Sequence, residues 1–80
     1  MVRPSLNDLA AFAAVASHQS FRRAAEIMGV SRSALSHAII GLEAKLDVRL
    51  FNRTTRSVSL TQAGARLLAR LDPVLQELDQ

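Results

Sequence analysis

Apolar side chains recur every three or four residues over three successive stretches of the chain, and a serine stands just before each stretch. The first stretch follows Ser5 and ends near 17–18, the second runs from Ser20 to Gly29, and the third follows Ser31. This period is that of a helix with one buried face, and serine is a preferred N-cap residue. We therefore predict three helices, with so tight a glycine turn between the second and third that they meet at a steep angle.

After position 47 the apolar period changes from about 3.6 residues to two. Val48 and Leu50, and later Val58 and Leu60, alternate with polar residues, and turn-forming and basic residues occupy 52–56 between them. Alternation with a period of two is typical of a half-buried strand. The pattern predicts a two-stranded hairpin with a charged tip, that is, a wing over 49–60.

A final helix is predicted after Thr61, which is its expected cap. Its apolar positions repeat by four, three and four residues, which is typical of a seam that packs on the core or on a second copy: Leu67, Leu71, Val74 and Leu78. Pro73 leaves two alternatives. It kinks one helix by removing a hydrogen bond to Ala69, or Asp72 caps a new turn that begins at Pro73.

Composition narrows the class of protein. Eighty residues and 8.7 kDa allow one domain, and alanine and leucine together make up 25 residues, so we expect a mainly α fold with a small β-hairpin. Cysteine is absent, and His18 and His37 lack the spacing of a metal motif. Because no nucleophile–base pair or phosphate loop can be assembled, we expect no enzyme, no cofactor and no metal. We also expect a cytoplasmic protein, since no signal-peptide or membrane-spanning run is present.

Charge is distributed unevenly along the chain. Residues 1–71 contain all ten basic side chains against four acidic ones, and the last nine residues contain three acids and no base. Between Val48 and Leu71 there are five arginines and no acid. Such a surface suits a polyanion, although a solvated basic face without a partner has the same composition.

These features together favour double-stranded DNA as the partner. A helix such as 31–46 fits the major groove and offers its first turns to base edges, and there it carries hydrogen-bonding side chains: Arg32, Ser33, Ser36 and His37. Helix N-termini and first-turn arginines suit phosphates, and the wing over 49–60 suits the DNA backbone or the adjacent minor groove. The residues are Ser20, Arg22, Arg23 and Ser31 on the helices, and Arg53 and Arg56 on the wing.

Other interpretations remain open at this stage. The serines could serve only as caps, the arginines could be merely solvated, and His37 could be an ordinary exposed side chain. A small basic helical module that binds an acidic protein, or a non-specific nucleic-acid binder, would have the same charge. The protein-binding module leaves the tight turn before the third helix without a purpose.

The sequence resembles the N-terminal DNA-binding domain of LysR-type transcriptional regulators over roughly residues 5–70. The motifs that carry the resemblance are Ser20-Phe21 with Ala24-Ala25, Val30-Ser31, Ala34-Leu35-Ser36, Ile39 with Leu42-Glu43, Leu46 with Val48-Arg49-Leu50-Phe51 and Arg53, and Leu60-Thr61 with Ala63-Gly64. The chain departs from the family where it has Arg32-Ser33 in place of Gln-Pro, His37 in place of arginine, Ile40-Gly41 in place of basic residues, and Asp47 in place of glycine.

The resemblance implies a bacterial winged helix-turn-helix over 1–60, followed by a linker helix over 61–80 that pairs with its counterpart in a homodimer. It implies binding to a pseudo-palindromic operator in the cytoplasm, at the nucleoid. It also adds Thr54 to the phosphate-contacting positions. The small-molecule effector of such regulators binds a C-terminal domain, which we expect to lie outside these 80 residues.

Overall fold

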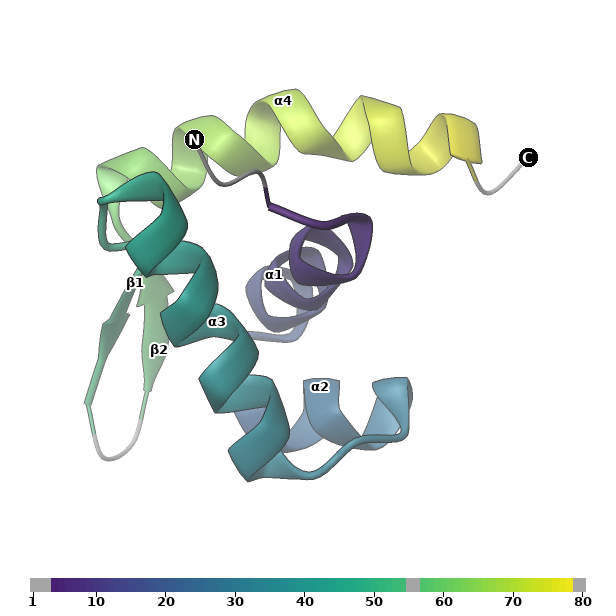
Figure 1. Ribbon diagram of the computed structural model, residues 1–80, viewed down its shortest axis with the longest axis vertical. Coiled ribbons are helices and arrows are strands. Elements are labelled where there is room, and N and C mark those ends of the chain that lie inside the picture. Colours follow the sequence, from purple (N-terminus) through teal and green to yellow (C-terminus); the bar gives the residue numbers. More distant parts are fainter. Residues whose placement is uncertain (1–3, 55–56, 79–80) are drawn as a thin grey trace.

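The computed structural model describes residues 4–54 and 57–78, and it shows four helices and one antiparallel hairpin in this part of the chain. The predicted mainly α fold with a small hairpin is confirmed. Figure 1 shows α1 between α4 on one side and α2 on the other, with the hairpin alongside α3. The elements in chain order are α1 (Leu6–His18), α2 (Phe21–Met28), α3 (Arg32–Leu46), β1 (Phe51–Arg53), β2 (Val58–Leu60) and α4 (Gln62–Leu78).

The predicted caps begin the helices. The Ser5 hydroxyl accepts from the Asp8 N–H at 3.0 Å while the Asp8 carboxylate accepts from the Ser5 N–H at 3.1 Å, which is a capping box. Ser20 and Ser31 accept in the same way from backbone N–H groups three residues later, at 3.1 and 3.0 Å. Each cap satisfies an N–H group that the helix itself leaves unpaired.

The first three helices end in the left-handed backbone region, which turns the chain sharply. Gln19 has φ 53°, Gly29 has φ 71° and Asp47 has φ 56°. Glycine adopts this conformation without a steric penalty, whereas asparagine and aspartate tolerate it better than most residues. Asp47 therefore ends α3 without the glycine that the family often has at this position.

Three phenylalanines from three elements meet in the core. The ring of Phe51 in β1 lies 5.4 Å from that of Phe12 in α1 and 6.0 Å from that of Phe21 in α2, measured between centroids. Tilted and edge-on pairs of this kind contribute about 0.5–1.5 kcal/mol beyond the burial of their surface. Phe51 thereby joins the hairpin to the helices.

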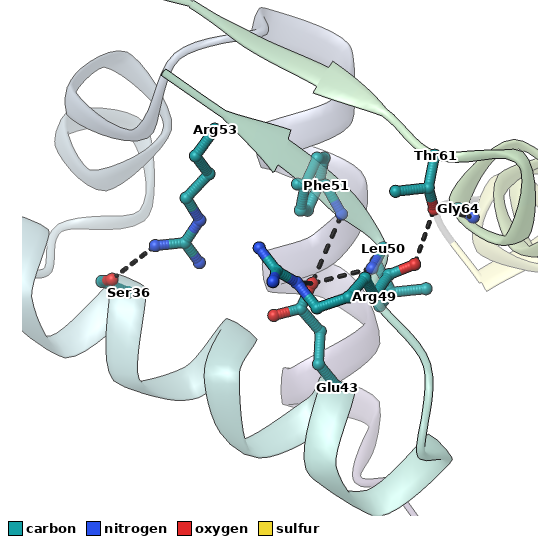
Figure 2. Close-up of polar contacts among 8 residues, drawn as sticks. All are labelled: Ser36, Glu43, Arg49, Leu50, Phe51, Arg53, Thr61 and Gly64. Carbon is teal, nitrogen blue, oxygen red and sulfur yellow. Dashed lines mark hydrogen bonds and ion pairs between the residues drawn. The ribbon is translucent and has the colours of Figure 1, made fainter. Parts of the chain in front are cut away.

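The hairpin begins later than the alternation of apolar residues predicts. The expected strand at Val48 and Leu50 is wrong: β1 spans Phe51–Arg53 and pairs with β2, with Phe51 opposite Leu60 and Arg53 opposite Val58. Val48 still belongs to the end of α3, since its N–H donates to the Glu43 carbonyl at 3.2 Å. The Glu43 Oε2 then accepts from the N–H groups of Leu50 at 2.7 Å and Phe51 at 3.3 Å (Figure 2). The N–H of Leu50 is thus bound to the end of α3.

The last helix is continuous through Pro73, so the alternative of a new helix capped by Asp72 is wrong. Thr61 caps it as predicted, because its hydroxyl accepts from the Gly64 N–H at 3.0 Å. The same hydroxyl donates to the Arg49 carbonyl at 2.6 Å, and the Thr61 N–H donates to the Leu50 carbonyl at 3.0 Å. The start of α4 is therefore bonded to the chain segment that enters the hairpin.

None of the helices in the described residues is long and apolar enough to cross a membrane.

Gly64 is required where α4 approaches this segment. It is buried, and a Cβ atom built on it would overlap the backbone carbonyl of Leu50. Gly41, inside α3, has no atom within 4 Å of the corresponding position. The two glycines therefore form a matched pair for substitution.

Gly64→Ala is expected to lower the free energy of unfolding by about 3 kcal/mol, because the added methyl group forces α4 away from Leu50. Gly41→Ala is expected to raise it by about 0.5–1 kcal/mol, since alanine removes the entropic cost of glycine inside a helix. Urea unfolding of both variants measures the two changes. Equal effects of the two substitutions would contradict the close approach.

An ion pair joins the start of α1 to the end of α3. The Lys45 Nζ lies 2.8 Å from the Asp8 Oδ2. This hydrogen bond, with the backbone bond from Ser5, lowers the pKa of Asp8 below its ordinary value of 3.8. A lowered carboxylate pKa contributes stability that is present above the unfolded-state pKa and is lost as pH falls through the folded-state value.

Asp8→Asn is expected to cost less than about 1 kcal/mol of stability at pH 7, because the pair is partly solvated. The difference between the wild type and this variant should shrink as pH falls below 3.8. Urea unfolding at a series of pH values checks this, with Glu77→Gln as a control at an exposed carboxylate near the end of α4. A difference that stays constant down to the lowest pH would contradict the assigned role of the pair.

Candidate nucleic-acid interface

The first turn of α2 carries positive charge at its amino end. Arg22 and Arg23 are exposed there, directly after the cap at Ser20, and no acidic residue shares the turn. A helix N-terminus has a partial positive charge, so two arginines beside it are unfavourable in isolation. An anion bound at this end would offset both charges.

The turn between α2 and α3 is closed by backbone hydrogen bonds. The N–H of Val30 donates to the Ala25 carbonyl at 3.0 Å, and Gly29 ends α2 in the left-handed region. Ser31 then caps α3. Because only two residues separate the end of α2 from this cap, the predicted tight helix-turn-helix is confirmed.

The third helix has one buried and one exposed side, as its sequence predicts. Leu35, Ile39 and Leu42 are buried against the other elements. In the first turns of the exposed side, the side chains of the proposed base-reading set are accessible to a partner. Arg32, Ser33 and His37 are exposed, and Ser36 is half-buried.

Arg53 turns toward the helices although it lies on the hairpin. Its Nη1 donates to the Ser36 hydroxyl at 2.9 Å (Figure 2), and its guanidinium carbon lies 4.2 Å from the centroid of the Phe21 ring. A cation placed over an aromatic face is attracted by the ring's quadrupole. The side chain thus bridges β1, α2 and α3.

Thr54 and Ser57 close the loop between the strands. The Thr54 N–H donates to the Ser57 carbonyl at 2.9 Å, and the Ser57 N–H donates to the Thr54 hydroxyl at 2.9 Å. The predicted phosphate contact of Thr54 therefore has to share a hydroxyl that already binds within the loop. Arg56, the other predicted contact at this tip, lies outside the described residues.

A surface concavity of about 460 Å³ brings many of the predicted residues together. It lies between the start of α2, the start of α3 and the hairpin. Of the predicted residues that the structure describes, Arg23, Ser31 and His37 are not part of its lining. The residues that line it are Gln19, Ser20, Phe21, Arg22, Arg32, Ser33, Ser36, Arg53, Thr54, Ser57 and Val58. Within the described ranges, no three histidine or carboxylate side chains gather as metal ligands would.

The family model for bacterial regulatory helix-turn-helix proteins of the lysR family matches residues 6–65, which is most of the chain. The chain belongs to this lysR family. The resemblance stated from its motifs is confirmed.

Similar proteins of the lysR family come from several bacteria. An uncharacterized HTH-type transcriptional regulator, YcaN of Escherichia coli K12, is 54% identical over 77 residues, which are 96% of this chain and 26% of that protein. A putative transcriptional regulator of Pseudomonas aeruginosa is 54% identical over 100% of this chain and 28% of its own length. This chain thus spans about a quarter of the length of these relatives, which are named as regulators and not as enzymes.

Solved structures of lysR-family proteins share the fold. Oxidized OxyR of Corynebacterium glutamicum has a TM-score of 0.91 at 36% identity, over 98% of this chain and 24% of that one. The crystal structure of a BenM_DBD/catB site 1 DNA complex has a TM-score of 0.89 at 33% identity, over 95% of this chain and 84% of that one. The fold is a winged helix-turn-helix.

The apolar positions predicted as a dimer seam do not share one surface. Leu71 is 7% exposed and lies in the chain's own core, and Leu67 is half-buried against that core. Val74 is 50% exposed. The side chain of Leu78 lies outside the described residues. Of the three positions whose side chains are described, only Val74 offers a substantially exposed side chain to a second copy.

Sequence reasoning missed the supporting residues of this interface. Phe21 supports the Arg53 guanidinium, Ser57 closes the hairpin loop, and the buried Glu43 fixes the start of the hairpin. Phe21 and Glu43 act on residues in other segments of the chain, and Ser57 acts on Thr54 across a loop that the apolar period does not describe. The one available signal was the position of Glu43, an acid in a motif that is otherwise apolar.

Proposed function

We propose that this chain binds double-stranded DNA at specific sequences, as the DNA-binding domain of a LysR-type transcriptional regulator. The observation that carries the proposal is the concavity in which side chains of α2, α3 and the hairpin gather around the exposed start of α3. A major groove admits one helix, and a helix that enters by its N-terminal end presents its first turns to base edges. The fold shared with the BenM_DBD DNA complex supports this placement.

The side chains divide into two roles. On the exposed side of α3, Arg32, Ser33, Ser36 and His37 read base edges, and an arginine paired with guanine is worth about 1–3 kcal/mol of discrimination. Phosphates bind the helix N-termini capped by Ser20 and Ser31, together with Arg22 and Arg23. A phosphate near α2 would offset the two arginines at its positive end.

The wing completes the set of backbone contacts. We include Thr54 and Arg56 at its tip and Arg53, in the last strand pair before the tip, in the proposed interface as contacts to phosphates or the adjacent minor groove, in keeping with the absence of acid between Val48 and Leu71. The two arginines add positive charge beside the groove that α3 enters. They would strengthen binding to any duplex without selecting a sequence.

We propose that the chain acts as a homodimer on a pseudo-palindromic operator. A twofold dimer presents two reading helices, and these need half-sites separated by about one helical turn or a multiple of it. In this proposal α4 supplies the contact. Of its predicted seam, Leu67, Leu71, Val74 and Leu78, Val74 meets the partner, while the buried Leu71 and the half-buried Leu67 support the helix from behind. In this proposal the protein works in the bacterial cytoplasm at the nucleoid, and effector sensing lies outside these 80 residues.

Selection from a randomised duplex library is expected to yield an inverted repeat that binds about 10³-fold or more tightly than random duplex, as specific binders do. Competition binding at several salt concentrations measures both the ratio and the salt dependence. Equal binding to all duplexes with a steep salt dependence would leave only a non-specific binder. No binding to DNA at all would favour the module that binds an acidic protein.

Two arginine variants separate base reading from charge. Arg32→Ala is expected to relax the preference at one base pair of each half-site, because its guanidinium contacts a base edge. Arg22→Ala should weaken binding to all duplexes and lower the salt slope by about one unit. The same competition assay checks both variants, and identical behaviour of the two would contradict the assigned roles.

A further inference from the structure

Ser36 has a hydrogen-bonding arrangement that Arg53 determines. A guanidinium has five N–H donors and no acceptor, so the serine oxygen must accept in the 2.9 Å bond from Arg53 Nη1. A serine hydroxyl has one hydrogen to donate and two lone pairs. Within the described residues the Ser36 side chain makes no other hydrogen bond, so its own hydrogen stays available.

Accepting from a cation also changes the strength of the remaining donor. Hydrogen bonds in a chain polarise one another, and those with an ionised partner are the stronger ones. The Ser36 hydroxyl lines the concavity beside Arg32 and Ser33, where the proposed duplex lies. It therefore faces the duplex as a polarised donor.

The guanidinium is held against the helices by its contacts with Ser36 and Phe21. Arg53 is half-buried, and its Nη2 atom is buried without a hydrogen-bond partner among the described residues. Leaving a charged donor unpaired costs stability, and nearly all buried polar groups in proteins are paired. This cost is offset in part by the stacking on Phe21, which holds the guanidinium in the position where it meets Ser36.

We propose that Arg53 is a positioning residue that fixes Ser36 as a hydrogen-bond donor, so that Ser36 selects a base with an acceptor on its major-groove edge. Guanine offers N7 and O6, thymine offers O4 and adenine offers N7, whereas cytosine offers only its amino donor. Cytosine at the contacted position is therefore disfavoured. This inference rests on the proposed DNA binding, and it changes the role of Arg53 from a backbone contact to an internal partner of the reading helix.

The test begins with the duplex that the wild-type chain selects. All four bases are placed in turn at each position of a half-site, and competition binding gives the preference at each. Ser36→Ala identifies the base pair that Ser36 reads, as the position where the preference falls. At that position the wild type should disfavour cytosine by about five- to tenfold.

Arg53→Met removes the donor to Ser36 while keeping a long side chain over Phe21. We expect it to remove the base preference at the same base pair as Ser36→Ala does. The double variant Arg53→Met/Ser36→Ala should lose no more of this preference than either single variant. Arg53→Lys keeps a charged donor, so it should retain part of the base preference that Arg53→Met loses. The salt slope should stay within half a unit of the wild type, whereas Arg22→Ala lowers it by about one unit.

Three results would overturn the inference: an unchanged preference in Arg53→Met, a double variant whose losses multiply, or a salt slope lowered by one unit with the preference intact. The last result would make Arg53 a phosphate contact. Urea unfolding of each variant shows whether the measured chain is folded. If Arg53→Met does not fold, Arg53→Lys is the variant that tests the inference. If the wild type itself shows no base preference anywhere, the proposed function fails and not this inference alone.

Discussion

The buried carboxylate of Glu43 is the constraint on which the placement of the hairpin depends. Its Oε2 accepts from the N–H groups of Leu50 and Phe51, and the Arg49 Nε lies 3.8 Å from the same oxygen. A charge-assisted hydrogen bond to a backbone N–H group is worth about 1.5–3 kcal/mol, and an unpaired carboxylate at this depth would cost more. The end of α3 and the start of the hairpin are therefore bound together by one group.

The strand that Glu43 positions contributes Phe51 to the core and Arg53 to the proposed interface. Side chains alternate between the faces of a strand, so residues 51 and 53 of β1 share the face that is turned toward the helices. Phe51 packs there between Phe12 and Phe21, and Arg53 lies over Phe21 and donates to Ser36. Stability of the wing and orientation of Ser36, a proposed base-reading side chain, thus rest on the same three-residue strand.

Much of this architecture could be predicted from local sequence. The caps at Ser20 and Ser31, and the faces of α3, follow from periods and residue types within single segments, and the structure confirms them. The strand bounds, the inward turn of Arg53 and the burial of Leu71 could not be predicted in this way. Each depends on a contact between segments: Glu43 with the hairpin, Arg53 with Ser36, and α4 with α1. An arginine in a basic stretch looks the same whether it faces a phosphate or a serine.

In the proposed complex the first turns of α3 meet the DNA. Amide chemical shifts of the ¹⁵N-labelled chain, followed while the selected duplex is added, test this placement of α3. We predict the largest changes at Arg32–His37, with further changes at Ser20–Arg23 and Asn52–Thr54, and little change around the Asp8–Lys45 ion pair at the opposite end of α3. Changes centred on α4, with the first turns of α3 unaffected, would contradict the account.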